Sequence, residues 1–387
     1  MARQQASLNE SNSAERAIAA RSRTRVATLV FDELRLRGPL TRAQLQMALR
    51  ASPVTITAAV RELTARQLVI ERGEGISTGG RRAHLLDLGP RVGGVLAVDI
   101  GSIRLRVAAA DMRGRIVARR TVDSPARPDR RRLRKLFGEV ANELGGPVRA
   151  VGVGLAAAVY PDGSIQVAPT MPEWDGYDFN RLFTDFDAPV LIENESNLAG
   201  LGEHRKGGHP DSDPVLFVAI GAGIGGSLIL GGDIYTGATG RAGELGDLRT
   251  GLVRGLELES KAGVHAIVKR YRELGGRGSA DAEIVFQLAA QGDTAAGAAV
   301  QQAIEEIALA LVNATSLIDP ARIVIGGGLA AAGDFLLEPV RALMEPHLLK
   351  VPEIVASRLG ADATLHGGIE WALDRGSEEL LDQVNSG

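Results

Sequence analysis

The most informative pattern of this chain is GAGIGGSLILGGDIYTGATGRAGELGD, residues 221–247. Together with the apolar run PVLFVAI before it, the stretch predicts a buried strand, a glycine turn and a second strand between residues 214 and 235. Gly221, Gly223 and Gly225 in the turn leave backbone N–H groups uncovered, and such turns can hold phosphate groups. Glycine turns also close plain hairpins, so this motif needs its neighbours before it indicates a function.

The same succession of strand, glycine turn and strand occurs at VLAVDIGSIRLRVAAAD, residues 95–111, where Asp99 and Gly101 mark the turn. A third glycine run at 326–328 would let a nucleotide base approach the backbone. Further segments have the composition of buried strands: VRAVGVGLAAAV (148–159), PVLIENESN (189–197) and RIVIGG (322–327). The C-terminal part therefore predicts an α/β body.

The N-terminal part predicts short helices followed by a hairpin. Apolar residues recur at helical spacing over 23–37, over 41–50 with Thr41 as cap, and over 53–67 with Ser52 as cap. Segments 68–72 and 83–88 alternate like paired strands, and GEGISTGGRR lies between them. This order is typical of a winged helix-turn-helix, predicted over residues 21–89 after a disordered lead of residues 1–20.

Small polar residues on the third predicted helix and arginines in the hairpin are candidates for DNA contact. Short side chains let the first turn of a helix approach base edges, and arginines beside flexible glycines suit a narrow minor groove. A solvated loop is the plain alternative for the two arginines of the hairpin. The predicted DNA-binding residues are Arg42, Ser52, Thr55, Thr57, Arg61, Arg81 and Arg82.

Charge is distributed unevenly along the 387 residues. Residues 1–90 contain 14 Arg, no Lys and 8 acidic residues, a balance of +6. The remaining residues contain 30 basic and 39 acidic side chains, a balance of −9. A basic head on an acidic body indicates that the head, and not the body, meets a polyanion such as double-stranded DNA.

The composition also excludes several classes of site. The chain has no cysteine, which rules out disulfides and thiolate metal sites, and its six histidines lack the spacing of a helical metal site. The polar stretch 204–209, which contains His204 and His209, is predicted to be a solvated loop. No run reaches the roughly 20 apolar residues of a membrane helix, and the N-terminus lacks a secretory segment. We expect no metal, no membrane contact and a cytoplasmic location.

With both parts in view, residues 23–375 resemble the ROK family, which contains bacterial sugar-responsive repressors and sugar kinases. Residues 221–247 resemble the family's second phosphate segment running into its effector-binding segment. The N-terminal helices and STGGRR (77–82) resemble the regulator branch, because the kinases of the family lack this module. The resemblance implies a two-lobed body over residues 90–387, similar to actin and hexokinase and ribonuclease H-like in fold.

The body departs from the family's kinases at two positions. The segment 193–197 matches the catalytic segment, but Glu195 replaces the Asp that acts as base. The extra methylene displaces the carboxylate by about an ångström, which can cost on the order of 100-fold in rate. Ile103 replaces a Thr of the first phosphate motif. We therefore expect no kinase activity, with Glu195 as a vestigial base, and no ATP or other cofactor.

The resemblance also implies that the family's zinc site is missing. Its His position is Asp247 here, and the following loop, 248–258, contains no Cys, so we expect packing to hold that loop. Trp174 either stacks on a sugar or anchors the core, and for Glu244 and Glu259 a capping or salt-bridged role is the alternative to ligand binding. Carboxylates and amides suit vicinal hydroxyls, so the predicted effector-binding residues are Asn194, Glu195, Glu244, Asp247 and Glu259.

The expected function is that of a transcription regulator in carbohydrate metabolism. Repression is expected because it is the more common behaviour of the regulators that the chain resembles. A homodimer or homotetramer would present two heads to a pseudo-palindromic operator, and a sugar or sugar phosphate between the lobes would change its DNA affinity. Two alternatives stay open: an ATP-dependent sugar kinase with an N-terminal extension, and a regulator with a non-functional pocket that acts through a protein partner. A C-terminal helix over 365–381 is predicted to pack on the linker side.

Overall fold

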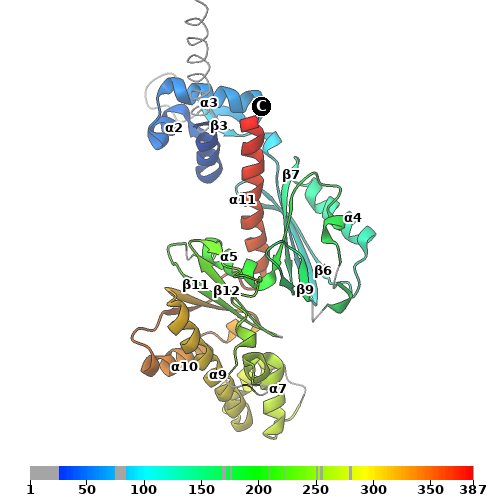
Figure 1. Cartoon of the computed structure of the whole chain (residues 1–387), viewed down its shortest axis with the longest axis vertical. Coiled ribbons are helices and arrows are strands. Elements are labelled where there is room, and N and C mark those ends of the chain that lie inside the picture. Colours follow the sequence, from blue (N-terminus) through cyan, green and yellow to red (C-terminus); the bar gives the residue numbers. More distant parts are fainter. Residues whose placement is uncertain are drawn as a thin grey trace, which may run out of the picture.

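A computed structural model describes residues 26–386, except for 75–83, 168–170, 175–176, 209, 222, 250–251, 253–255 and 279–280. The chain forms a head, a small lobe and a large lobe that follow one another along its longest axis (Figure 1). The predicted lead of residues 1–20 lies outside the described residues, as do Arg81 and Arg82 of the predicted hairpin turn.

The described part of the head contains a helix over 26–37, followed by α2 (Arg42–Leu49) and α3 (Pro53–Ala65). Strands β1 (Leu40–Thr41), β2 (Val69–Glu74) and β3 (His84–Leu88) form an antiparallel sheet in the order β1-β3-β2. Both predicted caps are confirmed. Thr41 closes a capping box with Gln44, and the Ser52 hydroxyl accepts from the Thr55 N–H at 3.2 Å.

The small lobe is built on a five-stranded sheet in the order β10-β7-β4-β5-β6. Strand β4 is buried along its whole length and pairs antiparallel with β5 and parallel with β7, so it forms the centre of the sheet. The helix α4 covers one face, and a two-stranded ribbon of β8 and β9 precedes β10. The elements are β4 (Gly94–Ile100), β5 (Arg104–Asp111), β6 (Ile116–Asp123), α4 (Arg130–Asn142), β7 (Val148–Leu155), β8 (Ala158–Val159), β9 (Ile165–Val167) and β10 (Val190–Asn194).

The large lobe repeats this plan with the strand order β13-β12-β11-β14-β15. Here β11 pairs antiparallel with β12 and parallel with β14, so the predicted repetition of strand, glycine turn and strand is confirmed in both lobes. The elements are β11 (Val215–Ile220), β12 (Ile224–Leu230), β13 (Asp233–Ile234), α6 (Leu258–Ala262), α7 (Val264–Glu273), α8 (Ala282–Ala290), α9 (Thr294–Ile318), β14 (Arg322–Gly326), α10 (Asp334–Met344) and β15 (Glu353–Ala356).

Two long helices lie between the sheets. Helix α5 (Glu195–Lys206) packs on the large-lobe sheet, α11 (Ala363–Ser386) packs on β4 and β7 of the small-lobe sheet, and the two helices pack on each other. Glycines allow this close approach, since a Cβ on Gly367 would lie 1.8 Å from the Leu198 carbonyl oxygen. The predicted solvated loop at His204 is wrong: this residue is buried in α5, because the helix is enclosed between two layers.

Helix α11 also joins the head to the body. It is longer than predicted, and instead of packing only on the linker side it runs from the junction of the lobes to the head (Figure 1). One apolar cluster contains Phe31 and Leu86 of the head, Val95 of β4, and Ile369 and Leu380 of α11. The head therefore shares its hydrophobic core with the small lobe.

Helix α9 is the one described helix that is long and apolar enough to cross a membrane. Half of its most apolar window is buried in the protein, and Ala303, Ile307 and Leu311 belong to the core of the large lobe. This is the ordinary arrangement of a core helix.

Candidate functional site

A cleft of about 500 Å3 lies between the lobes and contains every predicted effector residue. Its walls come from the start of α5, the β11–β12 turn, the segment after β13 and the start of α6. The chain folds this way because β10 runs directly into α5, which places the end of a small-lobe strand beside the glycine turn of the large lobe. The predicted residues that line the cleft are Asn194, Glu195, Glu244, Asp247 and Glu259.

Asn194 is largely occupied by the architecture of the cleft. Its Oδ1 accepts from the N–H groups of Ser196 at 2.7 Å and Asn197 at 3.3 Å, and so caps α5. Its Nδ2 donates to the Ala157 carbonyl at 2.9 Å. Asn194 therefore orients the helix that carries Glu195, and only one amide hydrogen remains for a ligand.

Glu195 is half-buried and lines the cleft, and the fully buried Asp99 lies close enough behind it for the two carboxyls to interact. Burial raises the pKa of Glu195 to about 7, helped by the nearby Asp99 and opposed by Arg106. Burial also raises the pKa of Asp99 to about 6, although Arg106 Nη1 donates to its Oδ2 at 2.9 Å. The carboxylate of the predicted first phosphate motif is thus already paired with a cation of this chain.

The opposite wall of the cleft is also acidic. Burial raises the pKa of Glu244, with Arg241 opposing and Asp247 and Glu259 adding to the shift. Arg241 is held by Asp247, whose Oδ2 accepts from its Nη2 at 2.5 Å. Glu259 Oε2 accepts from the Ile224 N–H at 2.9 Å, so this carboxylate fixes the end of the glycine turn.

The glycines of the turns allow neighbouring side chains to pack closely against the backbone, in addition to leaving N–H groups uncovered. A Cβ on Gly223 would lie 2.5 Å from Glu259 Oε2, and one on Gly225 would lie 2.2 Å from Ser196 Oγ. The N–H of Gly221 donates to the Gly223 carbonyl, and the N–H of Gly101 donates to the Arg104 carbonyl. These last two N–H groups close their own turns, so fewer donors than predicted face the cleft.

The segment after Asp247 is held by an ion pair in addition to packing. Arg249 Nη2 donates to Glu257 Oε1, the two residues also form a backbone bridge, and the Leu258 N–H donates to the Leu248 carbonyl at 2.8 Å. These contacts join the ends of the loop that lacks the family's cysteines. Over the described residues no group of three or more His, Asp or Glu side chains is placed to hold a metal ion.

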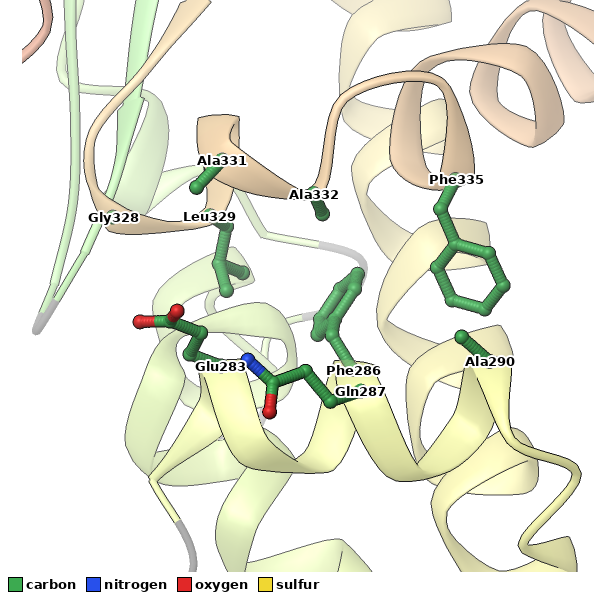
Figure 2. Close-up of a pocket in the computed structure, with 9 residues that line it drawn as sticks. All are labelled: Glu283, Phe286, Gln287, Ala290, Gly328, Leu329, Ala331, Ala332 and Phe335. Atoms are coloured by element: carbon green, nitrogen blue, oxygen red, sulfur yellow. The ribbon is translucent and has the colours of Figure 1, made fainter.

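A second, apolar pocket of about 200 Å3 lies beside the third glycine run. Figure 2 shows Glu283, Phe286 and Gln287 of α8 lining it from one side, with Leu329 and Phe335 coming from the segment that follows β14. The ring centroids of Phe286 and Phe335 lie 6.1 Å apart and the ring planes are nearly perpendicular, which is an edge-to-face contact. The pocket reaches Gly328 of the run, and the approach of a nucleotide base there stays a prediction.

Trp174, for which the sequence left two roles open, is a core anchor. It is 1% exposed, stacks on Phe179 with ring centroids 5.5 Å apart, and donates from Nε1 to the Pro125 carbonyl at 3.3 Å. It does not line the cleft.

On the head, the predicted DNA-binding residues differ in availability. Thr57 and Arg61 are exposed on α3. Ser52 and Thr55 share a hydrogen bond of 2.8 Å at the start of α3, and Arg42 donates to Glu71 of β2 at 2.7 Å. Those three side chains therefore shape the head, while Thr57 and Arg61 point outward.

Sequence reasoning missed Arg106 and Arg241. Arg106 lies directly across the β4–β5 ladder from Asp99, and this partner follows from counting residues on both sides of the turn. Arg241 carries no motif of its own, and only the folding of 241–247 brings it to Asp247.

Comparison with known proteins places this geometry in a family. The sequence pattern of the ROK family matches residues 95–375. The xylose repressor of Caldicellulosiruptor bescii is 22% identical over 333 residues, which cover 79% of this chain and 83% of the relative. A crystal structure of a ROK family glucokinase from Streptomyces griseus, in complex with glucose and AMPPNP, has a TM-score of 0.61 and 26% identity, covering 73% of this chain and all of the kinase.

A second solved structure extends the likeness to the head. A ROK family transcriptional regulator, a homologue of the E. coli MLC protein, has a TM-score of 0.75 and covers 95% of this chain and 100% of its own, with 21% identity. At that identity the likeness concerns the fold. Since the family pattern spans residues 95–375, which is most of the chain, this chain belongs to the ROK family.

Proposed function

We propose that this chain is a DNA-binding transcription regulator whose body responds to a sugar. The observation that carries the proposal is the head: the glucokinase structure covers 73% of the chain, whereas the regulator structure covers 95%. The likeness to a xylose repressor supports the same function. In this proposal residues 21–89 form a winged helix-turn-helix, with α3 as recognition helix and the β2–β3 hairpin as wing.

Two groups of side chains would contact the DNA. Thr57 and Arg61, exposed on α3, would face base edges in the major groove, and Arg81 and Arg82 in the wing would reach the minor groove or its phosphates. The pair of Arg42 with Glu71 would hold α2 against the wing strand. Footprinting of the full chain on DNA upstream of its own gene tests this: we expect a protected site, and uniform cleavage in the presence of protein contradicts it.

The regulator would act in the cytoplasm as a homodimer or homotetramer. A two-fold assembly presents two recognition helices at a fixed spacing, which matches a pseudo-palindromic operator. Repression is the sense that the xylose repressor relative supports. Analytical ultracentrifugation tests the assembly, and a monomer at micromolar concentration contradicts it.

The charge of the cleft favours an unphosphorylated sugar over a sugar phosphate. The side-chain carboxylates of Glu195 and Glu244 accept no hydrogen bond from described residues, and Arg241 is taken up by Asp247. Sugar hydroxyls would donate to these carboxylates, whereas a phosphate would add negative charge to a negative site. Calorimetry at pH 8 should show binding of D-glucose or D-xylose and none of glucose 6-phosphate; preferential binding of the phosphate would sink this assignment.

The runner-up function is an ATP-dependent sugar kinase with an N-terminal extension. The apolar pocket beside the third glycine run (Figure 2) and the carboxyl of Glu195 favour it. Two features oppose it: Arg106 pairs with the Asp99 carboxylate, and the exposed Ile103 replaces the Thr hydroxyl of the first phosphate motif. A coupled ATP-turnover assay with common hexoses separates the two. DNA binding with calorimetric silence across all sugars would instead favour a regulator that acts through a protein partner.

A further inference from the structure

The turn between β5 and β6, residues 111–115, is where a charged side chain of the body enters the head. Arg113 projects from this turn and is largely buried. Its Nη2 donates to Asp87 Oδ1 in β3 at 2.5 Å and to the carbonyl oxygen of Leu34 in the first helix at 3.0 Å. One guanidinium of the small lobe thus binds both a strand and a helix end of the head.

The base of Arg113 is fixed. Asp111 Oδ1 accepts from the backbone N–H groups of Arg113 at 2.9 Å and Arg115 at 3.1 Å. Gly114 completes the turn at φ +76, and the neighbouring Met112 is 1% exposed in the core shared by the head and the small lobe. A side chain presented from so restrained a turn transmits the position of the body to whatever it binds.

Asp87 is charged and has two arginine partners. Arg72 of β2 donates to its Oδ2 at 2.9 Å, and its Oδ1 also accepts from the Leu88 N–H at 2.8 Å. Burial raises its pKa, but the hydrogen bonds from Arg113 and Arg72 outweigh burial and hold the pKa below its usual value. Arg72 belongs to the head itself, whereas Arg113 comes from the body.

This ion pair is better suited to orientation than to stability. Desolvation offsets most of the attraction in a buried pair, yet removing one partner leaves an uncompensated charge. Arg113 Nε is buried and has no hydrogen-bond partner within the described part of the chain, so the contact is not the most stable one that a guanidinium can make.

The same turn rests on the far end of the cleft helix. A Cβ on Gly114 would lie 3.2 Å from Glu370 Oε1 of α11 and 3.6 Å from Lys206 Nζ, and these two side chains form an ion pair at 3.1 Å. Lys206 ends α5, whose first residue is Glu195. Twelve helical residues span about 18 Å, so a rigid rod leads from the cleft to the turn that carries Arg113.

We propose that Arg113 is the positioning residue that fixes the head on the body, through its paired bonds to Asp87 and Leu34. The inference deepens the proposed function, on which its regulatory meaning rests, because a ligand that shifts α5 would act on the head at this joint. The joint itself can be tested without DNA or sugar, so its failure and the failure of DNA binding are separate results.

The absence of cysteine makes the distance between head and body directly measurable by paired spin labels. Cysteines introduced at Met47 on α2 and Val117 on β6, which are 74% and 46% exposed, accept the labels. With the labelled chain diluted in an excess of unlabelled chain, so that only distances within one protomer contribute, we expect one narrow distance distribution for the otherwise native chain and a broad or shifted one after Arg113→Gln. Arg72→Gln is the matched control, since it removes the other arginine from the same carboxylate and should leave the distribution narrow.

The proposal is overturned if Arg113→Gln gives a distance distribution with the native width and the native mean. In that case the shared apolar core alone holds the head on the body. Circular dichroism reports whether this variant keeps its helices. If its helix content falls, Arg113→Lys takes its place, because Lys keeps the charge but cannot hold both acceptors in the same fork geometry. Broadening at native helix content then supports the proposal, and a native distribution overturns it.

Discussion

Arg106 and Asp99 face each other across the β4–β5 ladder, and the guanidinium donates to the buried carboxylate at 2.9 Å, close to Glu195 of the cleft. The carboxyl of the first phosphate motif is therefore neutralised by the chain itself. A cation-bound phosphate would have to displace Arg106 from the buried Asp99 carboxylate to reach it, which is costly. This pair separates the cleft from that of a phosphate-transferring enzyme.

The first prediction follows from this pair. The wild-type chain should show no ATP turnover with D-glucose, and the double variant Glu195→Asp/Ile103→Thr should remain inactive because Arg106 still occupies Asp99. A coupled assay measures this, with a ROK glucokinase as positive control. Turnover by the wild type that rises with glucose concentration would refute the regulator-only account.

The second prediction concerns stability against pH. Burial raises the pKa of Glu195 from 4.5 to about 7, so the folded state holds this proton more tightly than the unfolded state and loses stability as pH rises from 4.5 to 7. Glu195→Gln removes that loss. It should stabilise the fold by up to about 3 kcal/mol at pH 8 and by nothing below pH 4.5. Urea unfolding at pH 4 and pH 8 measures it, and an equal effect at both pH values contradicts the raised pKa of Glu195.

The third prediction uses the close contacts of the glycine turn. Gly225→Ala would place a Cβ 2.2 Å from Ser196 Oγ, forcing the start of α5 away from the turn and distorting the cleft. Sugar binding measured by calorimetry should fall at least tenfold. Gly297→Ala on α9 is the control, since nothing lies within 4 Å of the added Cβ. Equal affinity in both variants would mean that the ligand does not use this wall.

The fourth prediction concerns the wing. Replacing Arg81 and Arg82 with Ala should weaken DNA binding by about 100-fold and reduce the slope of log affinity against log salt by about 2. Arg131 and Arg132, an exposed pair on α4 of the body, provide the matched control when changed to Ala. Fluorescence anisotropy over a salt series measures both. If the two double variants lose affinity equally, the wing has no special contact.

The features that could be predicted from the sequence are those that depend on local or repeated patterns. The caps Thr41 and Ser52 each act within three residues, and the glycine turns recur with the same strand context in both lobes. Glu195 and Glu244 were found through their motifs, and the fold brings them to one cleft.

The features that could not be predicted from the sequence depend on contacts between segments that are far apart in the chain. His204 sits in a polar stretch that is typical of a loop, yet α5 is enclosed between two layers and buries it. Arg113 is 26 residues from Asp87, and neither lies in a motif. Trp174 was equally compatible with a sugar platform and a core anchor, and only the position of Phe179 decides between them.

Selection of genomic DNA fragments with the purified full-length chain, followed by sequencing of the retained fragments, would show whether the head binds specific DNA. We expect a small set of enriched fragments that share a pseudo-palindromic site, and loss of that enrichment when Thr57 and Arg61 on α3 are both changed to Asp. Retention of no fragment above background, or equal enrichment by this variant, would contradict specific DNA binding by the head.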